Sequence, residues 1–139
     1  ILDPCTQNFD FGEIIALHVR RTDYVSNSTN HPPCDISYYE EALKHFNDDI
    51  PVMIFSDDIE WCKENIKADI YADKSEGIHD LYILAHSQNT IMANSSFSWW
   101  GAWLIENPDK KVVAPARWFG PANTHLDTKD LIPDEWIKA

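Results

Sequence analysis

The sequence predicts an α/β fold with a Rossmann-like parallel sheet and helices on both faces. Short apolar runs rich in β-branched residues recur along the chain, and such runs are typical of strands buried on both faces. Segments with helical spacing of apolar residues lie between them, and strands that alternate with helices predict βαβ units. Polar segments directly follow several of the runs, where sheets of this kind bind their ligands.

The first predicted strand covers residues 13–19, and the polar segment 20–34 with its two adjacent prolines predicts a loop. Ser37 and Glu40 have capping-box spacing, which places a helix start near Ser37. The polar residues 47–49 should end that helix, and residues 51–55 predict the second strand.

The second half of the chain repeats this alternation. Asp57 and Glu60 again have capping-box spacing, so Asp57 is expected to cap a helix over residues 59–66. Asp80 lies near the start of a later helix and is expected to cap it. The remaining elements expected are a strand at 69–72, a helix at 78–86, a strand at 90–93, a helix at 96–105, a strand at 111–114 and a short element near Trp136.

Three tryptophans, Trp99, Trp100 and Trp103, fall within the helix expected over residues 96–105. Their spacing suggests that they share one helix face. Core packing is favoured for them over a platform on which sugars stack.

Length and charge restrict the classes of function. With 139 residues the chain is expected to form one domain. The formal net charge of −12 argues against a nucleic-acid surface, and no apolar run reaches the ~20 residues of a membrane span. The scattered cysteines, Cys5, Cys34 and Cys62, favour free thiols over disulfides or a zinc site.

The segment from His18 to Tyr24 is the densest cluster of candidate functional side chains. Arg20 and Arg21 follow a predicted strand, and a guanidinium binds phosphate oxygens in a bidentate fashion. Asp23 could hold one guanidinium in place. The alternative is a surface Arg–Asp pair of little energetic weight.

Two further polar segments also follow predicted strands. Asp57 and Asp58 could be metal ligands, ribose contacts or simply residues at a helix start, and the last interpretation is favoured. Asn94, Ser95 and Ser96 open a helix, where backbone N–H groups and hydroxyls form an anion site or serve as an ordinary cap.

Four blocks of the sequence together resemble glycosyltransferase family 11, the α-1,2-fucosyltransferases. They are residues 18–24, 55–65 (FSDDIEWCKEN), 94–104 (NSSFSWWGAWL) and 115–119. The third block is the most specific, whereas the first is shared with α-1,6- and protein O-fucosyltransferases.

The resemblance implies a GT-B fold with two Rossmann-like domains. Residues 1–139 would form the carboxyl-terminal domain that binds GDP-fucose, and the acceptor-binding amino-terminal domain would precede Ile1. The implied reaction is inverting transfer of L-fucose to O2 of a galactose-terminated glycan, without a metal or other cofactor. The isolated domain is expected to transfer nothing by itself.

The resemblance also implies roles for single residues. Arg20 and Arg21 would bind the pyrophosphate, and His18 would lie by the guanine or ribose. Asp80 would bind guanine, Ser96 would bind phosphate, and Asn94 and Ser95 would neighbour the phosphates. Asp57 and Asp58 would lie near the donor. Since Ser28 stands where α-1,6 enzymes have their proposed acidic base, the base must lie elsewhere. Asp23 is one candidate, and the acceptor-binding domain is another.

Two other functions fit the same residues. The chain could be a GDP-sugar-binding module without turnover, or a fucosyltransferase of α-1,6 or protein O-linked specificity. Bacterial members would be cytoplasmic, with peripheral association at the inner membrane, and eukaryotic members would lie in the Golgi lumen.

Overall fold

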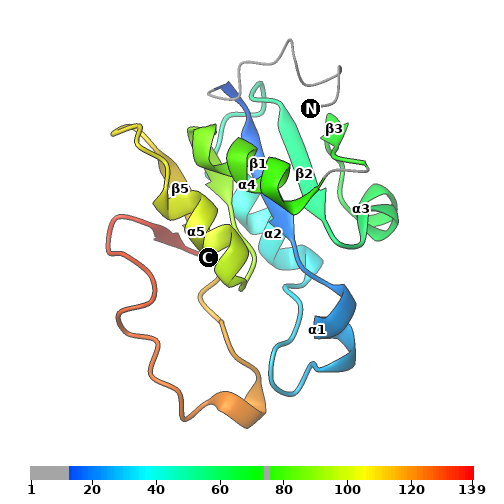
Figure 1. The fold of residues 1–139 in the computed structure, drawn as a ribbon, viewed down its shortest axis with the longest axis vertical. Coiled ribbons are helices and arrows are strands. Elements are labelled where there is room, and N and C mark those ends of the chain that lie inside the picture. The colour runs from blue at the N-terminus through cyan, green and yellow to red at the C-terminus, as the bar shows by residue number, and fades with distance from the viewer. Residues whose placement is uncertain (1–12, 74–75) are drawn as a thin grey trace.

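A six-stranded sheet with only parallel strand pairs forms the centre of the protein, which is described by a computed structural model covering residues 13–73 and 76–139 (Figure 1). The strand order is β3-β2-β1-β4-β5-β6, the order of a Rossmann sheet. The strands are β1 (Ile15–Val19), β2 (Val52–Ser56), β3 (Ile70–Tyr71), β4 (Asn89–Ile91), β5 (Lys111–Ala114) and β6 (Ile137–Lys138).

Helices cover both faces of the sheet. Figure 1 shows α4 (Gly77–His86) and α5 (Ser96–Trp103) in front of the sheet and α2 (Ile36–Leu43) behind it. α3 (Ile59–Asn65) contributes Cys62 to the same core cluster as α2. The predicted α/β architecture with a parallel sheet and helices on both faces is therefore confirmed.

The pleat of β1 separates two hydrophobic cores. Ile15, Leu17 and Val19 pack into the cluster that includes residues of α2 and α3. Ala16 packs with residues of α4 on the opposite face, and the ring of His18 lies 5.2 Å from that of Phe97 in α5. Successive strand residues alternate between faces, so β1 is buried along its whole length.

The predicted loop 20–34 contains one element that the sequence did not reveal. Residues Thr22–Ser26 form the one-turn helix α1, which is short and polar and leaves no apolar periodicity to detect. A short 3₁₀ turn, η3 (Pro121–Asn123), also lies in the carboxyl-terminal region. The other expected helices and strands are present, with boundaries that differ by a few residues.

Three predicted helix caps are wrong. Asp35, not Ser37, caps α2, because its carboxylate accepts from the Tyr38 backbone N–H at 3.0 Å. Asp58, not Asp57, caps α3 by accepting from the backbone N–H of Trp61 at 3.4 Å.

The third error concerns α4, whose N-cap position is Glu76, without a side-chain cap bond. Asp80 lies inside the first turn of that helix instead. Capping-box spacing alone did not distinguish neighbouring acidic and hydroxyl side chains, because the backbone at each helix start decides which of them reaches the free N–H groups.

The tryptophans of α5 do not share one environment. Trp99 is partly buried, and its indole Nε1–H donates to the Leu131 carbonyl at 2.7 Å. Trp100 and Trp103 are 53% and 51% exposed. The expectation of core packing is thus correct for Trp99 and wrong for the other two.

The cysteine prediction agrees with the structure where it is described. Cys34 and Cys62 are free thiols, and Cys5 lies outside the described residues. Within those residues, no helix is long and apolar enough to cross a bilayer.

We expect Gly101→Ala to lower the free energy of unfolding by about 1–3 kcal/mol, the usual cost of overpacking a core. A Cβ at Gly101 would lie 2.7 Å from the Cβ of Leu84, where α4 and α5 meet. The clash outweighs the ~1 kcal/mol by which alanine is the better helix former. Urea denaturation measures the difference.

Gly77→Ala is the matched control, because a Cβ there would meet Phe97 at an ordinary 3.9 Å. It should leave stability unchanged or raise it. Equal stability of the Gly101 variant and the unsubstituted protein would show that α4 and α5 can separate without cost.

Candidate functional site

The candidate site lies at the carboxyl edge of the sheet, beside the neighbouring strands β1 and β4. The chain leaves β1 toward α2 on one face and leaves β4 toward α5 on the other. This divergence opens a crevice outside the strand ends, where Rossmann-like sheets bind ligands. The segments 20–24, 57–58 and 94–96, predicted from the sequence as site segments, all follow strands that end at this edge.

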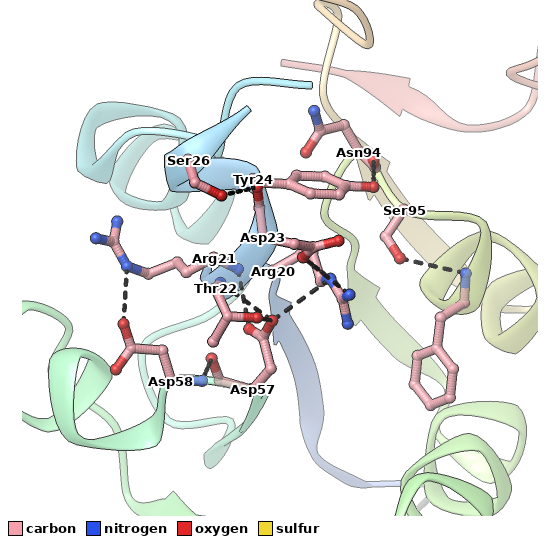
Figure 2. Close-up of polar contacts among 12 residues, drawn as sticks. Arg20, Arg21, Thr22, Asp23, Tyr24, Ser26, Asp57, Asp58, Asn94 and Ser95 are labelled. Atoms are coloured by element: carbon pink, nitrogen blue, oxygen red, sulfur yellow. Dashed lines mark hydrogen bonds and ion pairs between the residues drawn. The ribbon is translucent and has the colours of Figure 1, made fainter. Parts of the chain in front are cut away.

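The two adjacent arginines point away from each other (Figure 2). Their directions continue the alternation of β1, in which His18 faces the α4 and α5 side and Val19 faces the α2 and α3 side. Arg20 consequently remains at the crevice, whereas Arg21 turns to α3. The two arginines could not be distinguished from the sequence, whereas in the structure they have different surroundings.

Arg20 is held by two carboxylates. Its Nη2 lies 2.9 Å from Oδ1 of Asp23, and its Nε lies 3.4 Å from Oδ2 of Asp57. The side chain is 36% exposed. A guanidinium carries five N–H donors, so donors remain for a ligand in the crevice.

The same ion pair sets the ionisation of Asp23. The hydrogen bond from Arg20 is the main cause that holds the pKa of the Asp23 carboxyl below its ordinary value. Asp23 is thus a carboxylate at neutral pH, placed beside Arg20 and exposed to solvent.

Arg21 fastens the loop after β1 to α3. Its Nε donates to Oδ2 of Asp58 at 3.3 Å, and its Cζ lies 3.8 Å from the centre of the Trp61 ring. Its side chain is 18% exposed. An ion pair and a cation–π contact on one guanidinium give Arg21 a clear structural role.

Asp57 is the anchor of this loop. One carboxylate oxygen accepts from the Arg21 backbone N–H at 2.9 Å. The other accepts from the backbone N–H and the hydroxyl of Thr22, at 3.2 and 2.5 Å. Figure 2 shows this carboxylate directed at the loop. Because Asp58 caps α3, the Asp57 carboxylate is free to accept hydrogen bonds from the loop. The predicted role of Asp57 as the helix cap had excluded this.

His18 is buried beneath the crevice and is 6% exposed. Burial is the main cause that lowers its pKa from 6.5 to about 4, with Arg20 adding to the effect and Asp57 opposing it. The imidazole is consequently neutral at physiological pH. Its Nδ1 is buried and has no hydrogen-bond partner among the residues that the structure describes.

Asn94 connects three segments around the site and is 1% exposed. Its side-chain amide donates to the carbonyls of Pro32 and Trp118 at 2.8 and 2.9 Å. Its backbone carbonyl accepts from the Tyr24 hydroxyl at 3.1 Å. The geometry therefore makes Asn94 a residue that positions its neighbours.

Ser95 is the N-cap of α5, and its hydroxyl accepts from the Phe97 backbone N–H at 3.3 Å. Ser96 follows as the first residue of the helix and is exposed. Asp80 lies in the first turn of α4, whose packing against α5 brings it to the same side of the sheet. The beginning of α5 thus presents a positive dipole end and hydroxyls at the crevice.

Tyr24 and Thr22 are two site residues to which the sequence assigned no role. Tyr24 places its ring 5.6 Å from Cζ of Arg20 and joins the loop to Asn94 through its hydroxyl. Thr22 completes the bonds to Asp57. Their position inside the 18–24 block was the only available signal. Among residues 13–73 and 76–139, no group of three or more His, Cys, Asp and Glu side chains could hold a metal ion.

Comparisons with known proteins agree on one family. The sequence model of glycosyl transferase family 11 matches residues 5–138. An α-1,2-colitosyltransferase of Escherichia coli is 32% identical over 99% of this chain and 54% of its own length. The O-antigen biosynthesis glycosyltransferase WbnK of Escherichia coli is 35% identical over 88% of this chain and 43% of its own.

A more distant relative is galactoside α-(1,2)-fucosyltransferase 2 of Bos taurus, 34% identical over 65% of this chain and 30% of its own length. The chain thus spans about half the length, or less, of these curated relatives. No solved structure matches it.

Replacement of Asp57 by Asn should lower the free energy of unfolding by about 1–3 kcal/mol, the cost of leaving loop donors unsatisfied. The amide keeps the size of the side chain but turns one acceptor oxygen into a donor facing other donors. Thermal or urea unfolding measures the loss. Asp23→Asn is the control, since its pair with Arg20 is solvent-exposed and should contribute little to stability. Equal losses in the two variants would contradict the anchoring role.

His18 should make stability depend on pH in a defined window. Because its pKa is lower in the folded state, the stabilisation is present above pH 6.5 and is lost as the pH falls toward 4. Between pH 7 and 5 the unfolded imidazole takes up a proton that the folded one does not, which costs about 2 kcal/mol.

Urea unfolding at both pH values should therefore show a smaller loss on acidification for His18→Gln than for the unsubstituted protein. His86→Gln, at an exposed histidine, should lose as much as the unsubstituted protein. If all three proteins lost the same free energy of unfolding between pH 7 and 5, His18 would be protonated in the folded state at pH 5.

Proposed function

Because the chain belongs to glycosyl transferase family 11, we propose that it is the donor-binding half of an α-1,2-fucosyltransferase that uses GDP-fucose and a galactose-terminated acceptor. The observation that carries this proposal is the position of Arg20 and the start of α5 at the crevice between β1 and β4. Both offer hydrogen-bond donors suited to the pyrophosphate of a nucleotide sugar.

The proposed contacts of the donor divide between two sides of the crevice. Arg20 and the backbone at Ser95 and Ser96 bind the pyrophosphate. Asp80, in the first turn of α4, accepts from the N–H groups of guanine, since a carboxylate is an acceptor only. The neutral imidazole of His18 lies beneath them. Asp57, Asp58, Arg21 and Asn94 hold the loops that carry these groups.

The chemistry proposed for the site is inverting displacement at the anomeric carbon. The bond between the acceptor oxygen and that carbon forms as the bond to the β-phosphate oxygen breaks, and GDP leaves with the electron pair. Arg20 and the N–H groups at the start of α5 stabilise the charge that builds on the β-phosphate, as preorganised donors do. No metal is needed in this proposal.

A base must accept the proton of the acceptor hydroxyl. Asp23 is the candidate within this chain, because its carboxylate is ionised and exposed beside Arg20. Because the chain spans about half the length of its relatives, turnover is proposed for the longer protein, and this half supplies donor binding.

A second donor is favoured by one observation. The relative that matches 99% of this chain is named for colitose, which is L-fucose without its 3-hydroxyl group. The pyrophosphate and guanine contacts proposed above would serve either GDP-sugar. Two relatives matched over 88% or more of the chain are bacterial, and we propose a cytoplasmic site of action, peripheral to the inner membrane.

GDP-fucose should raise the thermal unfolding midpoint of the chain in the presence of EDTA, and Arg20→Ala should reduce the rise by about half or more. Ligand at a hundred times its dissociation constant stabilises by about 2.7 kcal/mol, which shifts the midpoint by several degrees. Loss of charge-assisted bonds of about 1.5–3 kcal/mol weakens binding about 10- to 100-fold.

Lys44→Ala is the control, because it removes a positive charge from an exposed side chain at the end of α2, away from the carboxyl edge of the sheet. It should keep the full shift. GDP-mannose, GDP-colitose and UDP-galactose test the selectivity for base and sugar. Equal shifts with UDP-galactose, or a full shift in the Arg20 variant, would overturn the assignment of the donor site.

A further inference from the structure

The tryptophans of α5 have an environment that the proposed donor site does not explain. Trp103 lies at the end of α5, and the donor crevice lies at its beginning. A helix of eight residues is about 12 Å long, so Trp103 is far from the pyrophosphate position. Trp103 is 51% exposed.

A pocket of about 390 Å³ lies next to Trp103 at the amino edge of the sheet. Its wall is formed by the end of α5, the loop that leads to β5, and the residues before β6. The volume falls within the range of ~300–1,000 Å³ that small-molecule sites occupy.

The indole of Trp103 has one face covered and one available. It stacks on Trp99 with the ring centres 5.2 Å apart and the planes within 10°. Trp99 is fixed in turn by its bond to Leu131 and by Trp136, whose ring centre is 5.9 Å away. Because Trp103 is 51% exposed and lines the pocket, the indole face opposite Trp99 is available as an apolar platform for a ligand.

Polar groups surround this platform. Glu106, Glu135 and Asn107 line the pocket. Among the residues that the structure describes, neither glutamate uses its side chain in a hydrogen bond or an ion pair. Four carboxylate oxygens are thus available as acceptors beside an aromatic face, an arrangement of few polar groups around an apolar surface that is typical of ligand sites.

Lys110 favours a neutral ligand over a cationic one in this pocket. Its Nζ donates to the carbonyls of Ala102 and Ile105 at the end of α5, at 3.1 and 3.2 Å. The ammonium lies 6.0 Å from the centre of the Trp136 ring. The fixed ammonium in the pocket wall repels a cationic ligand and so opposes the attraction of that ligand to the glutamates. A neutral polyol can donate hydroxyl hydrogen bonds to the glutamates without this repulsion.

We propose that this pocket is a saccharide-binding site, separate from the donor site, in which the C–H face of a pyranose stacks on Trp103 and its hydroxyls donate to Glu106 and Glu135. The site would hold part of a glycan at the amino edge of the sheet. The proposal needs only the pocket, and it does not depend on which nucleotide the other edge binds.

Isothermal titration and saturation-transfer NMR with lactose and methyl β-galactoside test it. We expect saturable binding to the unsubstituted chain that weakens at least tenfold in Trp103→Ala and in Glu135→Ala. Trp100→Ala is the matched control, because Trp100 is equally exposed on the same helix but does not line the pocket; it should bind as the unsubstituted chain does. The Glu135 variant keeps the test valid if the Trp103 variant fails to fold.

The donor site is assayed independently in the same samples. Trp103→Ala should keep its thermal shift with GDP-fucose, and Arg20→Ala should keep its binding of saccharide. Absence of saccharide binding, equal weakening in Trp100→Ala and Trp103→Ala, or preferential binding of choline would overturn the proposal, whatever the result with GDP-fucose.

Discussion

The alternation of side chains along β1 is the constraint on which the site depends. β1 is the central strand beside the crevice, buried on both faces, so each of its residues must face one of two helix layers. That alternation continues into the loop and sends Arg20 to the crevice and Arg21 to α3. A shift of one residue would exchange the two arginines and place Val19 where His18 lies.

Acidic residues hold the two arginines and their loop in position. This role explains part of the strongly acidic composition of a chain that is proposed to bind an anion. Asp57 accepts from the loop backbone, Asp58 caps α3 and pairs with Arg21, and Asp23 pairs with Arg20. Each carboxylate fixes a donor in a chosen direction. A phosphate approaching the crevice would meet a guanidinium that is already oriented, and binding would cost less side-chain entropy as a result.

The two edges of the sheet differ in chemistry. The carboxyl edge gathers charged and hydroxyl groups from segments far apart in the sequence, as the strand order requires. The amino edge carries the stack of Trp99 and Trp103 beside Glu106 and Glu135. α5 connects them, because it begins after its N-cap Ser95 at the proposed donor crevice and ends at Trp103 beside the pocket. The tryptophan block that indicated the family therefore contributes to both edges.

The sequence by itself determined the class of fold, the order of its main elements and the three segments of the candidate site, because buried strands and amphipathic helices have local periodicities. It also indicated the family, through blocks such as residues 94–104. It could not separate Arg20 from Arg21 or Asp57 from Asp58, since adjacent residues of one type look alike along the chain. Only the tertiary structure decided which guanidinium remains at the crevice, that Asn94 points inward, and that Trp103 is exposed. These properties depend on contacts between residues tens of positions apart, such as Arg21 with Asp57 and Asn94 with Pro32.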